Sequence, residues 1–196
     1  MKKSEASRRR ILDAAAKMFR DKGYAATTLN DIARLARMRA ASIYYHFESK
    51  DSLFAEVMDI GIDRIHDQVR RAVAALPDGA SHRRKVHTAI ETHLATLLKH
   101  SDYTAANIIN FGLAPAPIRR RHRGRREAYG DYWRELLGAA QAAGAIRPGV
   151  DLSLFRLFVI GALNWSQEWY RPKGKSIAEL ADDVTAMVFD GVAGEG

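Results

Sequence analysis

The sequence contains no cysteine. Disulfide bonds and thiolate zinc sites are therefore excluded, and nothing indicates an oxidising compartment. No apolar run approaches the roughly 20 residues that span a bilayer. The basic start, MKKSEASRRR, is not followed by the apolar stretch and small-residue cleavage site of a signal peptide. We therefore predict a cytoplasmic protein with no membrane partner.

Catalytic motifs are missing as well. The sequence has no GxSxG, no P-loop and no paired carboxylates at a recognisable spacing. His87 and Glu91 lie one helical turn apart and His93 and His100 two turns apart, a spacing that can bind a metal, but no HExxH and no third ligand is evident. We expect solvated or singly hydrogen-bonded histidines, and we predict no catalytic residue, metal or cofactor. A small helical enzyme is the disfavoured alternative.

Positive charge is in excess and is concentrated. The formal net charge is +8, and residues 119–126, RRRHRGRR, hold six arginines. Such a surplus favours an anionic partner. Arg8, Arg9 and Arg10 add a second cluster, which either reaches a minor groove and its phosphates or is a solvated basic start.

The stretch 27–50, TTLNDIARLARMRAASIYYHFESK, is the most informative part of the chain. Thr28 can cap a short helix, with Asp31 in the capping-box position. After an interruption at residues 37–39, a second short helix is expected from Ala40 to about His46. Its Ile43 and Phe47 lie four residues apart and can dock on the first helix. Two short helices and a tight turn predict a helix-turn-helix whose second helix enters the DNA major groove.

Groove entry explains the small and polar residues of this stretch. Small side chains at the start of the second helix let its backbone approach the base edges, and hydroxyl, imidazole and ammonium groups can bind phosphates. Two adjacent tyrosines point about 100° apart on a helix, so at least one should face outward. The predicted DNA contacts are Thr27, Thr28, Arg37, Arg39, Ala40, Ala41, Ser42, Tyr44, Tyr45, His46 and Lys50.

Several residue types at fixed spacing carry a family resemblance. Residues 27–28, 31–33, 43–47 and 49–53 together resemble the DNA-binding domain of TetR-family transcriptional regulators. The resemblance is tight over residues 8–55 and covers the rest only in helix count and length. It implies an all-α homodimer that binds a palindromic double-stranded operator, usually as a repressor, and leaves it when a small-molecule effector binds the C-terminal domain.

Two positions of the turn depart from the family pattern. The family has Gly and then a small polar residue where this chain has Arg37 and Arg39. An arginine in left-handed geometry is strained by about 1 kcal/mol, and Arg39 cannot cap the second helix as Ser or Thr would. Both guanidinium groups would lie beside the groove, and Arg39 is the stronger candidate because arginine pairs bidentately with guanine.

The periodicity of the remaining chain predicts about nine helices in all. We expect helices over residues 4–22, 50–76, 81–100, 102–115 and 118–143, and two more starting after Asp151 and at Ser176. We divide the chain into a helix-turn-helix DNA-binding domain, 1–50, and a ligand-binding and dimerisation domain, 51–196. The helix over 50–76 is long enough to belong to both domains and is the natural lever between them.

The last two helices are strongly amphipathic. They can pair with their copies in a four-helix bundle across a two-fold axis, and the alternative is that they only complete the monomer core. The predicted dimerisation residues are Phe155, Phe158, Ala162, Val184, Met187 and Val188.

Amides interspersed with apolar residues suit a ligand cavity, although a surface helix fits residues 102–115 nearly as well. The predicted ligand-binding residues are Asn107, Asn110, Phe111, Trp133, Asn164 and Trp165. The segment 164–174 is similar to the C-terminal part of TetR-like repressors of lipid, sterol or acyl-CoA breakdown, which implies a coenzyme A thioester as effector. The arginine run 119–126 would then bind phosphates, unless it is a solvated face or adds nonspecific DNA affinity. A DNA-binding protein without a ligand is the second alternative.

Overall fold

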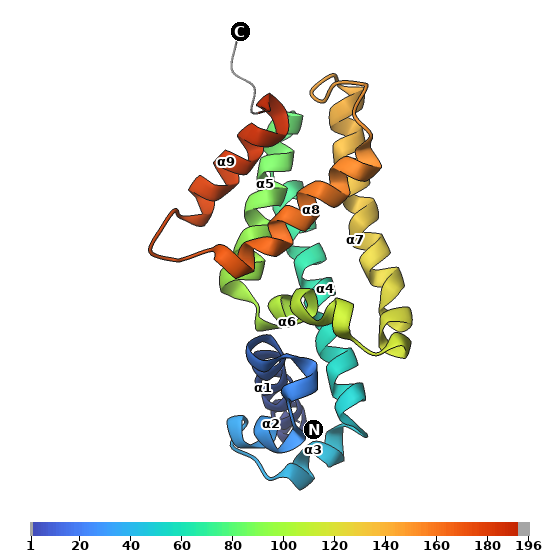
Figure 1. Ribbon diagram of the computed structural model, residues 1–196, viewed down its shortest axis with the longest axis vertical. Helices are drawn as coiled ribbons and strands as arrows, with labels where there is room; N and C mark the ends of the chain where they lie inside the picture. The colour runs from blue at the N-terminus through green and yellow to red at the C-terminus, as the bar shows by residue number, and fades with distance from the viewer. Residues whose placement is uncertain (1, 192–196) are drawn as a thin grey trace. The chain divides into compact units, whose positions relative to one another are not determined.

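The computed structural model describes residues 2–191. This part of the chain is all-α, with nine α-helices, a π-helical turn and a 3-10 turn (Figure 1). None of these helices is both long and apolar enough to cross a lipid bilayer. The elements are α1 (Lys2–Ala26), α2 (Leu29–Leu35), α3 (Ala40–His46), α4 (Lys50–Ala74), α5 (His82–Ala95), η1 (Thr96–His100), α6 (Asp102–Asn110), η2 (Phe111–Leu113), α7 (Ala116–Ala142), α8 (Leu152–Trp169) and α9 (Ile177–Asp190).

Helix boundaries follow the capping residues of the sequence. Thr28 and Ser176 each form a complete capping box, and the side chain of Asp151 accepts from two free amides of α8. Such caps replace hydrogen bonds that the first turn of a helix lacks. Gly23 has φ 77° and ψ 167°, which interrupts α1 where a stop was predicted. The predicted caps and the stop are confirmed.

The chain divides into two compact units. The first consists of Met1–Arg64 with Ser101–Arg126, and the second of Ile65–His100 with Glu127–Gly196. The first unit therefore contains α6 and the start of α7 in addition to the helix-turn-helix. This division by compactness differs from the functional boundary predicted at residue 50, which stays a prediction.

A continuous apolar core holds the first unit together. Ile11 and Phe19 of α1, Ile32 of α2, Ile43 of α3 and Phe54 of α4 are fully buried in it. The Phe19 and Phe54 rings meet edge to face at 4.9 Å. Each such side chain contributes about 1.5–3 kcal/mol when it leaves water. The core thus fixes α3 through one buried residue and leaves its other faces available.

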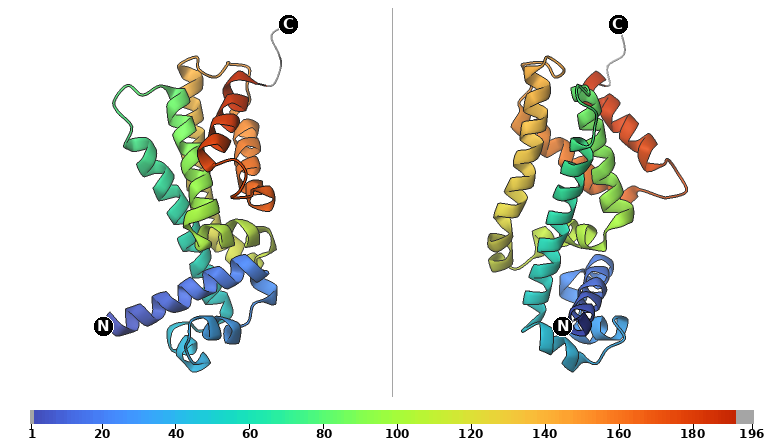
Figure 2. Two further views of the ribbon diagram at one scale, coloured as in Figure 1. Left: turned by 90° about the vertical axis from the view of Figure 1, so that its left-hand side faces the viewer. Right: turned by 180° about the vertical axis from the view of Figure 1, so that it is seen from behind.

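Polar side chains of α6 bind the main chains of two other helices. The Asn110 amide donates to Phe19 O at 2.9 Å and accepts from Tyr24 N at 2.7 Å, which joins α6 to α1. Figure 2 shows α6 crossing α1. The Thr104 hydroxyl donates to Gly61 O of α4 at 3.0 Å. A Cβ atom at Gly61 would lie 2.3 Å from Tyr103 O, so α4 and α6 approach each other in a way that only glycine permits at this position.

The second unit has its own core, built mainly on α5. Val86, Ile90 and Leu94 are buried on α5, which packs against α8 and α9. Arg83 of α5 forms a bidentate ion pair with Asp190 of α9, with N–O distances of 2.6 and 2.7 Å. Other buried apolar residues of this unit are Trp133, Leu137, Val159, Leu163, Leu180 and Ala181.

The helix approach at Gly61 predicts opposite effects of the same substitution in two helices. Gly61→Ala should destabilise the protein by about 1–3 kcal/mol, because its methyl group would overlap Tyr103 O and the Asn107 side chain. Gly124→Ala in α7 meets nothing within 4 Å and should stabilise by about 0.5–1 kcal/mol. Urea unfolding measures both. Equal effects of the two substitutions would contradict the close approach.

Candidate nucleic-acid interface

The turn between α2 and α3 is held by main-chain hydrogen bonds. Met38 N donates to Ala33 O at 2.9 Å and Arg37 N donates to Arg34 O at 3.1 Å. Arg37 has φ 54° and is the only non-glycine residue with positive φ in the described chain. The left-handed geometry expected at this departure from the family pattern is confirmed, with a cost of about 1 kcal/mol.

Helix α3 buries one side and exposes the other. Ile43 and, just after the helix, Phe47 are buried in the core, whereas Tyr44 is 61% and Tyr45 is 79% exposed. The sequence required at least one tyrosine to face outward, and the structure exposes both. The rest of the predicted surface lies with them: Arg39 and Ala41 are exposed, and Ala40, Ser42 and His46 are half-buried.

The two arginines of the turn keep their guanidinium groups free. Arg39 occupies the position before α3 without a side-chain capping bond. Among residues 2–191, neither its side chain nor that of Arg37 forms a hydrogen bond or an ion pair, although Arg34 pairs with Asp31 at 2.7 Å. Both cations are thus available for an anionic or base-edge partner beside α3.

Two predicted phosphate contacts are corrected by the structure. Thr27 is only 1% exposed, and its hydroxyl donates to Gly23 O at 2.7 Å, so it holds the end of α1 instead of binding phosphate. The Lys50 ammonium donates to Tyr24 O at 3.0 Å and Thr27 O at 3.1 Å, and lies 4.3 Å from the Tyr24 ring centre. Lys50 therefore binds carbonyl groups at the end of α1 and just after it. The role of Lys50 depends on residues 23 and 26 positions away, which spacing alone does not reveal, whereas Thr27 binds a carbonyl only four residues before it.

Thr28 is exposed but already engaged. Its hydroxyl donates to the Asp31 carboxylate at 2.8 Å and accepts from Asp31 N at 3.1 Å. These hydrogen bonds hold the pKa of Asp31 below its ordinary value. Thr28 therefore shapes the start of α2, and its phosphate contact stays a prediction.

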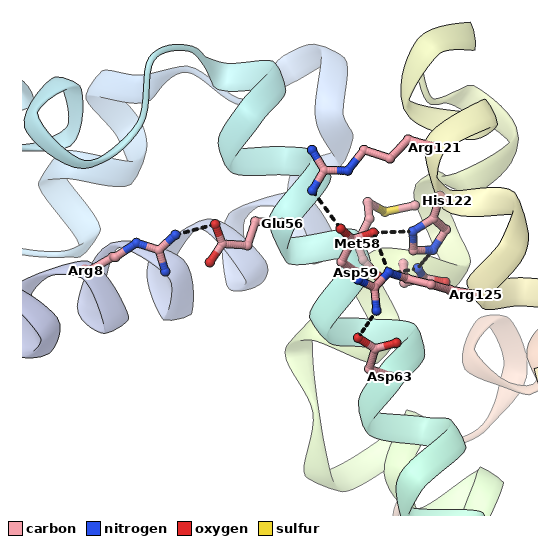
Figure 3. A network of polar contacts seen from close by, with 9 residues as sticks. Arg8, Glu56, Met58, Asp59, Asp63, Arg121, His122 and Arg125 are labelled. Atoms are coloured by element: carbon pink, nitrogen blue, oxygen red, sulfur yellow. Dashed lines mark hydrogen bonds and ion pairs between the residues drawn. The ribbon is translucent and has the colours of Figure 1, made fainter.

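The N-terminal arginines serve packing more than surface charge. Arg8 pairs with Glu56 and its guanidinium lies 4.9 Å from the Phe47 ring centre, while Arg10 donates to Ala36 O at 2.5 Å (Figure 3 shows the Arg8 pair). Only Arg9 of the three has no hydrogen-bond partner among the described residues and is exposed. The two bound arginines brace α1 against α4 and the turn.

Three members of the arginine run take part in a polar network of α4 and α7 that is centred on the buried Asp59 and His122 (Figure 3). Asp59 accepts from Arg121 at 2.9 Å and from His122 Nδ1 at 2.9 Å, and Arg125 pairs with Asp63 and lies 3.4 Å from Asp59. Arg119 binds Ala114 O in the same way, at 2.5 Å. These four side chains have partners within the fold, which corrects the predicted use of the whole run as a phosphate site. The alternative of a solvated face stands, because every arginine of the run except Arg126 is exposed.

The network lowers the pKa of Asp59 and orients its neighbours. Burial raises the pKa of Asp59, but hydrogen bonds from His122 and Arg121 and the nearby arginine charges outweigh it and hold the pKa below its ordinary value. Asn107 donates its amide to His122 Nε2 at 2.7 Å and to Met58 O at 2.8 Å. With the Asn107 amide nitrogen as donor, His122 Nε2 is the acceptor, and its Nδ1 faces the Asp59 carboxylate.

Asn107 and Asn110 are not free to line a cavity, which corrects their prediction as ligand residues. Both are buried, and their amide groups are used by Met58 O, His122, Phe19 O and Tyr24 N. They join helices of the first unit. The neighbouring Phe111 is half-buried beneath the guanidinium of Arg126, whose carbon lies 3.9 Å from the ring centre.

A polar cluster lies inside the second unit, around His93. The imidazole contacts the Tyr129 hydroxyl at 2.8 Å and Asn164 Oδ1 at 3.1 Å, and its ring lies 6.4 Å from that of Trp133. Burial lowers the pKa of His93 to about 4, against the effect of Asn164, so the ring is neutral at pH 7. The structure brings the predicted Asn164 and Trp133 together and adds His93 and Tyr129. The expectation of a solvated or singly bonded His93 is wrong, because periodicity at 3.6 residues does place it on the buried face of α5.

Trp165 does not join this cluster but lies in an exposed apolar stripe on α8. The predicted dimerisation residues Phe158, which is 75% exposed, and Ala162 belong to the same stripe. Sequence analysis missed Leu154 and Leu157, which are exposed beside them. On α9 Met187 is exposed, whereas Val184 and Val188 are half-buried like Phe155 of α8.

Within the described residues, no three His, Cys, Asp or Glu side chains gather as a metal site. In particular, His87 contacts Asp182 of α9 at 2.7 Å rather than Glu91 of its own helix.

Comparison with known proteins identifies the class. Residues 11–57 match the profile described as "Bacterial regulatory proteins, tetR family", and residues 79–192 match "Tetracyclin repressor-like, C-terminal domain". The chain belongs to the TetR family. It is a DNA-binding transcriptional regulator with an N-terminal helix-turn-helix and a C-terminal helical domain, and it is not an enzyme.

Individual relatives agree over nearly the whole length. The HTH-type transcriptional repressor KstR2 of Rhodococcus jostii (strain RHA1) is 27% identical over 190 residues, which cover 95% of this chain and 91% of that protein. The crystal structure of AibR with isovaleryl coenzyme A and operator DNA is 26% identical with a TM-score of 0.83, and the match covers 93% and 98% of the two chains. The ketosteroid transcriptional regulator KstR2 of Mycobacterium tuberculosis is 25% identical with a TM-score of 0.79, over 96% and 95%.

Proposed function

We propose that this protein is a repressor that binds a palindromic operator as a homodimer and is released by an acyl-coenzyme A or another lipid-derived effector. The observation that carries the proposal is the outward face of α3. Tyr44 and Tyr45 are exposed there although an apolar core lies directly behind them, and Arg39 stands unpaired beside them. A protein that binds operator DNA acts in the cytoplasm, where bacterial DNA lies.

The chemistry of this face suits duplex DNA. Ala40 and Ala41 allow close approach of the α3 backbone, and their methyl groups can contact thymine. Arg39 can donate two parallel hydrogen bonds to guanine or pair with phosphate, and the hydroxyls of Tyr44 and Tyr45 are placed to donate to phosphates. Arg37 adds a second charge that strengthens binding without regard to sequence.

The exposed stripe of α8 supports the homodimer. Apolar side chains at positions 154, 157, 158, 165 and 169 are exposed in the single chain, and Gly161 and Ala162 lie between them. A contiguous apolar face of this kind on a soluble regulator marks a protein interface. A second copy that packs α8 and α9 against the same helices forms a closed four-helix bundle. Two α3 helices would then read half-sites about 34–36 Å apart.

The effector proposal rests on the relatives and on the interior of the second unit. AibR is described in one complex with isovaleryl coenzyme A and operator DNA, and KstR2 as a ketosteroid transcriptional regulator. The cluster of His93, Tyr129, Trp133 and Asn164 offers a few oriented polar groups among apolar side chains, which is the composition of small-molecule sites. An effector acts by its different affinity for the DNA-competent and DNA-incompetent states. Because α4 contributes residues to both units, a shift of its second half would re-aim α3.

Removal of one α3 contact should weaken operator binding while the fold is kept. Arg39→Ala and Tyr44→Ala each should raise the operator Kd by about 5–100-fold, the loss of one specific contact of about 1–3 kcal/mol. Arg120→Ala, which removes an exposed arginine of α7, is the control for charge alone. Fluorescence anisotropy with labelled operator measures the affinities. An operator Kd unchanged by Arg39→Ala would remove that residue from the interface.

Isovaleryl coenzyme A should release the operator if the effector is an acyl thioester. We expect the operator Kd to rise at least tenfold at saturating thioester, since the ligand favours the DNA-incompetent state. The measurement is the same anisotropy titration, with coenzyme A alone as control. Release by a ligand of another class, with no effect of any acyl-coenzyme A, would overturn the effector class while the DNA-binding function stands.

A charge in the α8 stripe should break the dimer. Phe158→Glu would desolvate a carboxylate between two apolar faces, a cost of several kcal/mol that far exceeds its effect on the monomer. Leu113→Glu is the matched control, because Leu113 is 80% exposed in the 3-10 turn outside the stripe. Sedimentation velocity distinguishes monomer from dimer. An intact dimer of Phe158→Glu would count against this interface.

A further inference from the structure

We infer that Arg126 is the anchor for an anionic group of the effector, a phosphate or a carboxylate, in the first compact unit. The inference deepens the proposed function and rests on it for the identity of the ligand as effector. The arginines of residues 119–126 differ in burial and in partners. Arg126 alone is half-buried, and within the described chain it has no acidic or main-chain partner.

The surroundings of Arg126 leave its charge uncompensated. Its guanidinium packs on the Phe111 ring at 3.9 Å, and its sole hydrogen bond within residues 2–191 is a long one of 3.3 Å to Asn107 Oδ1. By contrast, Arg121 and Arg125 of the same helix each contact a carboxylate of α4. Burial lowers the pKa of Arg126, with no counteracting acid. The group therefore has a stacking partner and an amide neighbour, but no counter-ion.

An uncompensated cation in this setting is costly for a fold. Transfer of a charged group from water without an opposite charge destabilises the folded state, and a nonpolar side chain of similar length would serve the packing on Phe111 better. An anion that binds the free edge of the guanidinium would remove this penalty, since arginine offers a planar fork that matches phosphate and carboxylate. The half-buried position leaves access for such a group.

The same contacts connect Arg126 to α4, the helix that directly follows α3. Asn107 Oδ1 accepts from Arg126, and its amide nitrogen donates to Met58 O of α4 and to His122 Nε2. An anion on Arg126 competes with Asn107 Oδ1 for the guanidinium. Binding at this arginine thus acts on a side chain that is hydrogen-bonded to α4.

The test combines thermal unfolding with calorimetry on the full chain. Three probes are used: the coenzyme A thioester proposed above, inorganic pyrophosphate and isovalerate. Arg126→Met keeps a long side chain on Phe111 and removes the charge. Without ligand it should raise Tm by about 2–4 °C, and it should weaken binding of the responding probe at least tenfold. Arg126→Lys should bind with intermediate affinity, since its charge remains without the fork.

Arg123→Met is the matched control, because Arg123 is an exposed arginine three residues earlier on α7. It should change neither Tm nor probe binding. Binding of the thioester and pyrophosphate without isovalerate identifies phosphate as the anionic group, and binding of isovalerate identifies carboxylate. The inference is overturned if no probe binds the wild type, if Arg126→Met binds as the wild type does, or if Arg126→Met loses binding together with a fall in Tm.

Failure of this inference and failure of the proposed function are separable. Operator binding without ligand tests the DNA-binding function and does not involve the probes. A protein that binds operator but shows no Arg126-dependent anion binding refutes the anchor alone. If the protein binds pyrophosphate through Arg126 but binds no operator, the proposed regulatory function is refuted and the anion site stands.

Discussion

The close approach of α4 and α6 at Gly61 is the constraint on which the first unit depends. With no side chain at Gly61, the two helices come near enough for Thr104 to bind Gly61 O and for Asn107 to bind Met58 O. One turn further along α6, Asn110 binds the main chain of α1. Buried amides that lose water must find partners, and these find them in three different helices. Helix α4, which directly follows α3, is thereby bound to α6. These hydrogen bonds would break if either helix shifted.

The turn of the helix-turn-helix differs from this arrangement, because two of its arginines have no side-chain partner among the described residues. Arg37 is held in left-handed geometry and Arg39 in a position where Ser or Thr would cap α3. Local rules disfavour both residues, and rules of this kind are most often broken at functional sites. Within the described chain, the two arginines of the turn have no side-chain partner, and two tyrosines are exposed on the short helix that follows. This set is consistent with a partner that supplies phosphates and base edges. By contrast, Thr27 and Lys50, which looked equally suited to phosphate, are used inside the fold.

Sequence patterns predicted what local chemistry determines. Helix number, the caps at Thr28 and Ser176, the stop at Gly23 and the buried Ile43 all follow from spacing and residue type within a few turns. The role of Asn107 and the fate of the arginine run did not, because they depend on Asp59, Asp63 and Met58, some 50–60 residues away. His93 was misjudged for the same reason: its two partners lie on α7 and α8. The exposed stripe of α8 was predicted only in part. Amphipathicity shows that a helix has an apolar face, but not which apolar residues pack inside the monomer and which stay exposed.

The central claim is that two copies of α3 read one operator together. Footprinting of the wild-type protein on an operator selected from random duplexes tests it most directly. The account predicts two protected half-sites on one face of the duplex, related by a dyad and separated by about one helical turn, 34–36 Å. Protection of a single half-site, or uniform protection that disappears at moderate salt as nonspecific binding does, would contradict it.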